Sequence, residues 1–148
     1  MLYDSIYDAF PSQSGCLKHL ENFFWEGKPE CPYCKSHKQS EIPGDRYKCN
    51  NCNRSYRVTV NTLFHNTKCD IQRWFLAIIT FRENKNVSAR GLARRIRVNK
   101  NSAFHIQKIL QQAYAKKPAL FKLLADSLND KINIVEFEKW TESKDINH

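Results

Sequence analysis

The sequence has few residues that interrupt or loosen regular structure. Four glycines and five prolines among 148 residues leave little room for flexible linkers. No run of apolar residues is long enough to span a bilayer. The first ten residues carry two acids and no base, unlike a signal peptide. We therefore expect a cytoplasmic protein without a membrane partner, and its 41% of hydrophobic residues can form a real core.

Acidic residues are almost missing from the middle of the chain. Residues 71–117 contain eleven basic residues and one acidic residue, a net charge of +10. Residues 1–30 carry −3 and residues 118–148 carry −2, so the positive charge lies between mildly acidic ends. A solvated basic helix surface could have this composition. So uneven a distribution nevertheless favours a site for a polyanion such as nucleic acid.

Four of the six cysteines form two Cys-x-x-Cys pairs separated by 14 residues. They are Cys31, Cys34, Cys49 and Cys52. Two such turns that face each other supply four thiolates at tetrahedral geometry, which is what a structural zinc ion needs. Two disulfides or a redox pair are the alternatives, but disulfides are disfavoured without an export signal and a redox motif needs a βαβ context. We therefore predict Zn²⁺ as the cofactor, in a closed site without a catalytic position, and we interpret Cys16 and Cys69 as reduced thiols.

The basic segment predicts three helices. The first follows Asp70, a good N-cap residue, and has apolar residues on several sides, so we expect it to be a central helix. A short helix capped by Ser88 and a longer helix capped by Asn99 follow. A short helix, a tight turn and a longer helix form the helix-turn-helix pattern. Arg97 stands in this turn where many such turns carry glycine, so we expect the turn to be less tight.

The second helix of this pair has the features of a recognition helix. Ala103, Ile106 and Leu110 form an apolar stripe, and hydrogen-bonding side chains form the opposite stripe. That stripe can enter the major groove and pair with base edges, although a plain solvated face would look the same. We expect bases to be contacted through residues 100–108. The residues that we expect to contact DNA are Lys100, Asn101, Ser102, His105, Lys108, Gln112, Arg90, Arg94, Arg95, Arg97 and Lys116.

Several of these motifs together resemble a known family. They are Cys31-Pro32-Tyr33-Cys34, the run from Tyr47 to Tyr56, the run from Val58 to His65, and the run from Trp74 to Ile78. The combination is similar to the N-terminal part of a family of bacterial insertion-sequence transposases, whose eukaryotic relatives are the Merlin elements. The resemblance covers roughly residues 15–137. It implies a zinc ribbon and a helix-turn-helix that bind terminal inverted repeats, followed by a ribonuclease-H-like domain that cuts DNA with three acidic residues and Mg²⁺ or Mn²⁺.

The sequence departs from this family in two places. Asn61 stands where the family usually has glycine. The catalytic domain is missing, because Glu138 falls about where the first catalytic acid would lie and the chain ends ten residues later. Residues 131–140 look extended, and Glu136 and Glu138 would then be solvent-facing residues of an alternating strand. Since two-metal cutting needs several carboxylates, we expect no catalytic residues and no enzyme activity.

The sequence therefore predicts a mainly α protein with a small β zinc ribbon followed by a helix-turn-helix. The expected segments are an N-terminal helical segment (1–30), the zinc ribbon (31–66), the helix-turn-helix domain (67–117), and a C-terminal helix with an extended tail (118–148). We predict sequence-specific binding of double-stranded DNA, as a regulator or as a targeting subunit for a separate effector or nuclease protein, with a homodimer left open. The alternatives are the DNA-binding piece of a split or truncated transposase and a zinc-ribbon protein-interaction adaptor.

Overall fold

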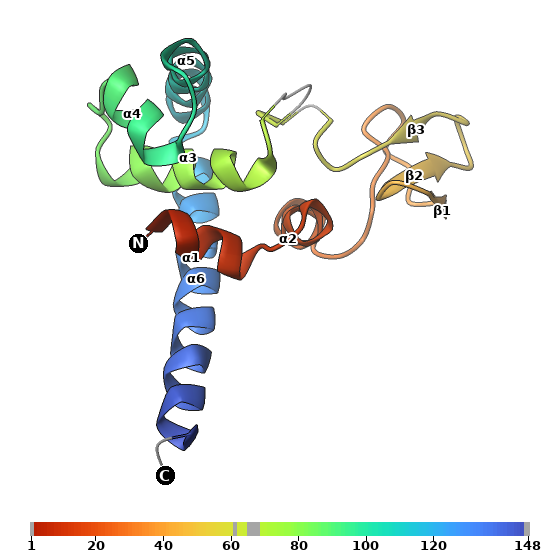
Figure 1. Ribbon diagram of the computed structural model, residues 1–148. Coiled ribbons are helices and arrows are strands. Elements are labelled where there is room, and N and C mark those ends of the chain that lie inside the picture. Colours follow the sequence, from red (N-terminus) through yellow and green to blue (C-terminus); the bar gives the residue numbers. More distant parts are fainter. Residues whose placement is uncertain (1, 61, 65–68, 147–148) are drawn as a thin grey trace. The chain divides into compact units, whose positions relative to one another are not determined.

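The computed structural model describes residues 2–60, 62–64 and 69–146, except for the side chains of residue 2 and residues 135–146. Within them, the chain is mainly helical, with a small antiparallel sheet, as predicted (Figure 1). The helices are α1 (Leu2–Ala9), α2 (Gln13–Trp25), α3 (Ile71–Glu83), α4 (Ala89–Ile96), α5 (Lys100–Lys116) and α6 (Pro118–Ile146), and the strands are β1 (Gln39–Ile42), β2 (Arg46–Cys49) and β3 (Ser55–Tyr56). They form two compact units, a helical unit of Met1–Pro11 with Cys69–His148 and a ribbon unit of Ser12–Lys68.

Helix α3 is the centre of the helical unit. Ten of its thirteen residues are buried, because its apolar side chains point in several directions and meet α1, α4, α5 and α6. Its two buried polar side chains both have hydrogen-bond partners. Gln72 donates to the carbonyl of Phe10 at 3.0 Å, and Thr80 donates to the carbonyl of Leu76 at 2.8 Å. The predicted central helix is thus confirmed.

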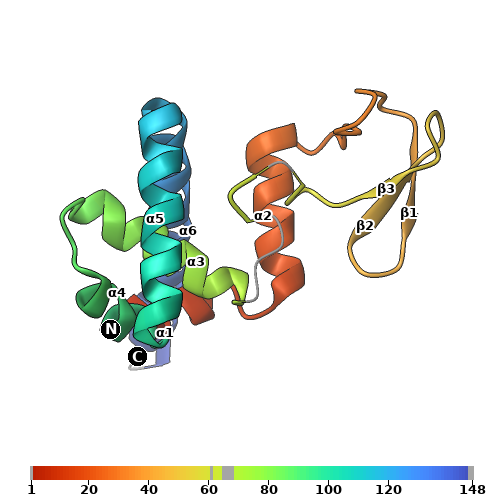
Figure 2. The same ribbon diagram turned by 90° about the horizontal axis from the view of Figure 1, so that it is seen from above.

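Helices α4 and α5 begin at the residues that the sequence indicated. The Ser88 hydroxyl accepts from the backbone N–H of Gly91 at 3.0 Å, and the Asn99 side chain accepts from that of Ser102 at 2.8 Å. Each cap satisfies a backbone donor that the helix itself leaves unpaired. The two helices contact each other and α3, and α5 crosses α3 in Figure 2. Three residues, 97–99, join the pair.

The turn between α4 and α5 is tight, which corrects the expectation from Arg97. Arg97 has φ 57° and ψ 53°, the left-handed conformation that usually selects glycine. Its N–H bonds to the carbonyl of Ala93, and the N–H of Val98 reaches the same carbonyl at 3.1 Å. The Arg97 guanidinium lies 3.8 Å from the centroid of the Tyr3 ring. This cation–π contact offsets the strain of a non-glycine residue in this conformation, about 1 kcal/mol.

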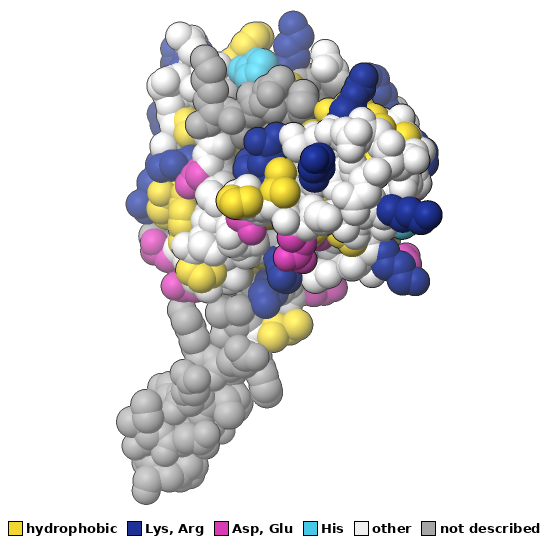
Figure 3. All heavy atoms as spheres, turned by 90° about the vertical axis from the view of Figure 1, so that its right-hand side faces the viewer, with side chains coloured by type: hydrophobic (Ala, Val, Ile, Leu, Met, Phe, Trp, Pro, Cys, Tyr) yellow, Lys and Arg dark blue, Asp and Glu magenta, His cyan; other side chains and the backbone are white. Residues whose placement is uncertain are grey.

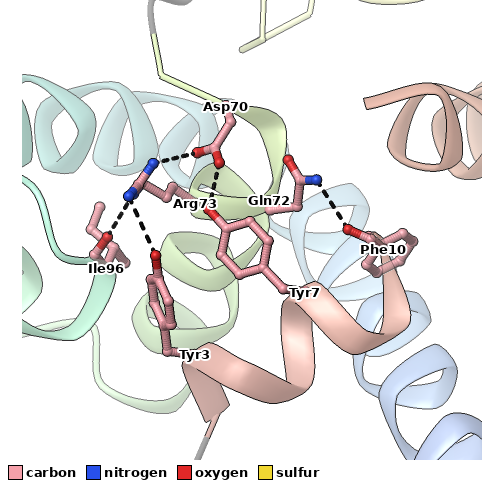
Figure 4. Close-up of polar contacts among 7 residues, drawn as sticks. All are labelled: Tyr3, Tyr7, Phe10, Asp70, Gln72, Arg73 and Ile96. Carbon is pink, nitrogen blue, oxygen red and sulfur yellow. Dashed lines mark hydrogen bonds and ion pairs between the residues drawn. The ribbon is translucent and has the colours of Figure 1, made fainter. Parts of the chain in front are cut away.

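A polar network joins α1 to the ends of α3 and α4 (Figure 4). Arg73 donates to the carbonyl of Ile96 at 3.1 Å, to Asp70 at 3.2 Å and to the hydroxyl of Tyr3 at 3.3 Å. Tyr7 donates its hydroxyl to the other oxygen of the Asp70 carboxylate. Asp70 does occupy the N-cap position of α3, but its side chain makes no capping hydrogen bond there, because the carboxylate is held by Tyr7 and Arg73.

Helix α6 continues through the stretch that was expected to be extended. The prediction of an extended segment at 131–140, with Glu136 and Glu138 on an alternating strand, is therefore wrong. The buried side chains of α6 follow helical spacing, and no glycine or proline after Pro118 interrupts the helix. They are Phe121, Leu124, Ala125, Leu128 and Ile132. This face packs against α1, α3 and α5 as far as Ile132, and the helix continues beyond it.

The ribbon unit consists of α2 and a three-stranded antiparallel sheet in the order β1-β2-β3. Ser12 caps α2 by accepting from the N–H of Gly15 at 3.1 Å. Strand β3 ends at Tyr56, and the chain then turns, with the N–H of Val60 donating to the carbonyl of Arg57 at 3.1 Å. Asn61 lies outside the described residues.

The N-terminal 30 residues do not form one segment. Helix α1 belongs to the helical unit, whereas α2 belongs to the ribbon unit. The boundary expected at residue 31 therefore does not separate two compact units. No helix among the described residues combines the length and the apolar character that crossing a membrane requires.

We predict that Arg73→Met lowers the free energy of unfolding by about 1–3 kcal/mol, because it removes the donor of the Ile96 carbonyl and the donor of one of the two Asp70 carboxylate oxygens. Urea denaturation measures the change. Arg90→Met is the control: Arg90 is exposed on α4, and its replacement should cost less than about 0.5 kcal/mol. Equal losses in the two variants would contradict a stabilising role of the Arg73 network.

Candidate metal centre and nucleic-acid interface

The four paired cysteines converge on one point of the ribbon unit. Their sulfur atoms all lie within 4.8 Å of one another. Cys31 Sγ lies 3.7 Å from Cys52 Sγ, and Cys34 Sγ lies 3.5 Å from Cys49 Sγ. Four thiolates bound tetrahedrally at about 2.3 Å from a zinc ion would be separated by about 3.8 Å. The cluster therefore fits Zn²⁺ with four protein ligands, which leaves no coordination position for a substrate.

Two similar backbone turns hold these cysteines. In the first, the N–H of Lys35 bonds to the carbonyl of Cys31 at 2.9 Å; in the second, the N–H of Asn53 bonds to the carbonyl of Cys49 at 2.9 Å. Both Lys35 and Asn53 have φ 64°, so in each turn the chain reverses its direction directly after the second cysteine of the pair. The Cys49 turn starts at the end of β2, whose pairing with β1 and β3 fixes it in place.

Neighbouring polar groups favour the thiolate form of Cys34. The side-chain amide of Asn51 lies 3.5 Å from Cys34 Sγ, and this hydrogen bond, together with one from the backbone of Ser36, lowers the pKa of the Cys34 thiol to about 6. The backbone N–H of Cys52 points at Cys49 Sγ at 3.4 Å. Such donors orient the sulfur atoms and stabilise their negative charge, as partners of metal ligands commonly do.

An aromatic cluster covers the metal centre on one side. Trp25 at the end of α2 packs edge-on against Tyr47 and Tyr56, with ring centroids 5.9 Å apart in both pairs. The Tyr47 hydroxyl donates to the Glu21 carboxylate, a second link between α2 and the sheet. Burial, together with the negative charge of the four cysteines, raises the pKa of Tyr56 to about 12. Helix α2 thus supplies the apolar cover that the cysteine turns lack.

The residues expected to contact DNA lie on α4, on α5 and in the turn between them. Asn101, His105, Lys108 and Gln112 are all exposed on α5, opposite its buried residues Ala103, Ile106 and Leu110. Lys100, Lys116 and the arginines 90, 94, 95 and 97 are exposed as well. Ser102 is half-buried, and its backbone N–H is used by the Asn99 cap.

Two of these arginines already have partners within the helical unit. Arg95 forms an ion pair with Glu83 at 3.3 Å, and Arg97 lies on the Tyr3 ring. Glu83 is the single acid of residues 71–117, so the pair neutralises only a small part of the positive charge. Arg90 and Arg94 lie one turn apart on α4, and both are exposed.

One residue of this surface was not singled out from the sequence. Phe104 lies on α5 next to His105, and 59% of its surface is exposed. The apolar stripe of α5 is complete without it, because Ala103, Ile106 and Leu110 already fill the buried side. Helical spacing in the sequence could have identified Phe104 as exposed, because it falls one turn after Asn101 on the polar side of the helix.

The ribbon unit also presents basic side chains. Arg54 lies 4.8 Å from the centroid of the Tyr33 ring, so the two cysteine turns place an arginine and a half-exposed aromatic ring side by side. Figure 3 views the face that carries the ribbon, and lysine and arginine side chains project from it. The exposed basic residues between β1 and β3 include Arg46, Lys48 and Arg54.

Comparison with known proteins agrees with this architecture. Residues 11–55 match a family model described as a transposase zinc-ribbon domain. The N-terminal region is transposase-related. The match begins before α2 and ends in β3, so it includes the helix that packs on the metal centre. The four cysteines are accordingly the ligands of a zinc ribbon, which confirms the predicted cofactor.

A curated relative extends the similarity beyond the ribbon. The chain is 26% identical over 117 residues to a protein described as an uncharacterized protein in transposable element ISH50, from Halobacterium salinarum. The alignment covers 76% of this chain and 40% of the relative, so the chain spans well under half of the length of the curated relative it matches. No solved structure matches this chain.

We predict one zinc ion per chain, lost in Cys49→Ser together with the fold of the ribbon. Metal binding contributes much of the folding free energy of so small a unit, on the order of 10 kcal/mol. Elemental analysis measures the metal, and proteolysis of the ribbon measures its folding. Cys69→Ser is the matched control, because Cys69 lies outside the cysteine cluster and its replacement should leave the zinc content unchanged. Zinc-free parent protein, purified without chelator, would contradict the assignment.

Proposed function

We propose that this chain binds double-stranded DNA in a sequence-specific manner, with α4 and α5 acting as a helix-turn-helix and α5 lying in the major groove. The observation that carries the proposal is the exposed polar side of α5 beside the exposed arginines of α4. Both belong to a segment with a net charge of +10. A surface of one charge sign attracts a polyanion, and a row of hydrogen-bonding side chains on a protruding helix can distinguish base pairs.

The two helices have different roles in this proposal. Asn101 and His105 lie in the first turns of α5, where a recognition helix contacts base edges. An asparagine amide can bond to both N6 and N7 of adenine, and a lysine such as Lys108 can bond to guanine. Arg90 and Arg94 on α4 hold phosphates, which positions the module without selecting a sequence. Arg97 contributes from the turn, with its guanidinium kept in place by the Tyr3 ring.

The zinc ribbon adds phosphate contacts in the same proposal. Its two cysteine turns and its hairpin carry exposed lysines and arginines, including Lys35, Arg46, Lys48 and Arg54. A zinc ion with four thiolates has a net charge of −2, which these bases more than offset. The ribbon therefore remains attractive to DNA after metal binding. A protein-interaction adaptor is the rival role for the ribbon, and failure of the full chain to bind any duplex would favour it.

The cellular role that we propose is that of a transposase-derived regulator or targeting subunit. The curated relative belongs to a transposable element and is longer than the part that aligns. A second candidate is the DNA-binding piece of a split or truncated transposase, in which this chain, alone or as a homodimer, supplies DNA binding and a separate effector or nuclease protein supplies the catalytic groups.

We predict that base contacts and phosphate contacts respond differently to mutation. Asn101→Ala and His105→Ala should each cost about 1–3 kcal/mol on the preferred duplex and relax the choice of base. Arg94→Ala should weaken binding to all duplexes alike and lower the slope of log K against log salt by about one, because one fewer counterion is released. Titration of specific and random duplexes at several salt concentrations measures both effects. Folding should change by less than about 0.5 kcal/mol in all three variants, because the three residues are exposed.

A duplex preference unchanged in Asn101→Ala and His105→Ala would show that α5 does not read the bases, and the specificity would then be sought in the ribbon. A flat dependence of affinity on salt would exclude the phosphate-binding mode altogether.

We predict that this chain alone does not nick supercoiled plasmid with Mg²⁺ or Mn²⁺. The resemblance implies three catalytic acids, whereas in this sequence a single acid, Glu138, falls about where the first of them would lie, and one carboxylate does not suffice for two-metal cutting. Gel electrophoresis of the plasmid measures nicking. Metal-dependent nicking by the chain that disappears in Glu138→Ala would overturn the prediction, whereas nicking that requires a second protein would favour the split-transposase role.

A further inference from the structure

The polar side of α5 contains one large apolar group. Phe104 exposes 59% of its surface, and its ring contacts no other aromatic ring among the described residues. Single exposed apolar residues are common and need no explanation by themselves. The position of this one is informative, because Asn101 precedes it by one turn and Lys108 follows it by one turn, both on the exposed side of the helix.

The major groove presents one kind of apolar group to a helix. Adenine, guanine and cytosine display only hydrogen-bond donors and acceptors there, whereas thymine adds a C5 methyl group to its acceptor. A phenyl ring placed against donors and acceptors would remove water from them without replacing their hydrogen bonds, which is unfavourable. Against a thymine methyl group, the same ring gains apolar contact at no such cost.

The geometry of α5 relates Phe104 to its neighbour Asn101. Residues three apart on a helix are displaced by about 4.5 Å along its axis, which is close to the spacing of about 3.4 Å between base pairs. The two side chains would therefore face adjacent or nearly adjacent base pairs. With an asparagine amide suited to adenine, the pair is suited to a short A·T-containing step.

We propose that Phe104 is a specificity-determining residue that packs against the C5 methyl group of a thymine in the preferred duplex. This inference rests on the proposed function, because it requires α5 to lie in the major groove. It adds the chemical identity of one recognised group, which neither the zinc ribbon nor the basic charge defines.

The test removes the methyl group from the DNA and the ring from the protein. A preferred duplex is first selected from a random pool with the full-length zinc-loaded chain. The same duplex is then made with deoxyuridine in place of every thymidine, which deletes only the C5 methyl groups. Dissociation constants for both duplexes are measured with the parent chain, Phe104→Ala, Phe104→Leu and Leu123→Ala. Leu123 is the matched control, because it is an equally exposed apolar residue, 60% exposed, on α6.

The parent and Leu123→Ala should bind the thymine duplex about fourfold or more tightly than the uracil duplex, the effect expected for one buried methyl group. Phe104→Ala should bind the two duplexes equally, and Phe104→Leu should keep part of the difference. Replacement of single thymidines should then assign the effect to one position. All variants should retain the parent's unfolding midpoint, because neither Phe104 nor Leu123 is buried.

Equal binding of the two duplexes by the parent would overturn the inference, as would a difference that persists in Phe104→Ala. A change of sedimentation coefficient in Phe104→Ala, with the thymine preference retained, would instead place Phe104 in a protein interface. These outcomes are distinct from failure of the proposed function, which would appear as no duplex binding by the parent or as binding indifferent to Asn101→Ala.

Discussion

The direction of α5 depends on how the last turn of α4 is held. The final carbonyls of a helix have no partner within it, and at Ile96 the missing donor is the guanidinium of Arg73. The same guanidinium bonds to Asp70 and to Tyr3, whose ring in turn supports Arg97. This half-buried network therefore fixes the end of α4 and the turn that leads into α5. In the proposed DNA-binding role, where α5 would have to be presented at a defined angle, α1 contributes to that presentation through Tyr3.

In the ribbon unit, the cysteine cluster holds two turns in place. Its two turns contain residues with positive φ, Lys35 and Asn53, and the apolar cluster packed against the cysteines is small, with Tyr56 and Trp25 as its largest members. The sulfur geometry sets the distance between the turns, the sheet sets the register of one of them, and α2 closes one side with Trp25. This explains why the family match begins before α2: a ribbon without the helix would expose the aromatic face of Tyr47 and Tyr56.

Local chemistry made part of this structure predictable. The caps Ser88 and Asn99 act on backbone groups three residues away, and the cysteine spacing defines a ligand set by itself. Long-range contacts decided what the sequence could not show. Tyr3, near the N-terminus, supports the left-handed conformation of Arg97, and α2 joins the ribbon through Glu21 and Tyr47. Helix α6 packs on three helices as far as Ile132 and continues as a helix beyond it.

Charge and selectivity are carried by different residues in the proposed interface. The arginines of α4 and its turn supply attraction that every duplex shares, and their long side chains tolerate small changes in position. The exposed side of α5 has only three lysines in seventeen residues, so its contacts depend on hydrogen-bond geometry and on the fit of one phenyl ring. Such contacts fail when the helix shifts by about 1 Å. Sequence selectivity in the proposed interface therefore requires the Arg73 network to hold α5 in position. A loosely held helix could still bind DNA, but it could not distinguish one sequence from another.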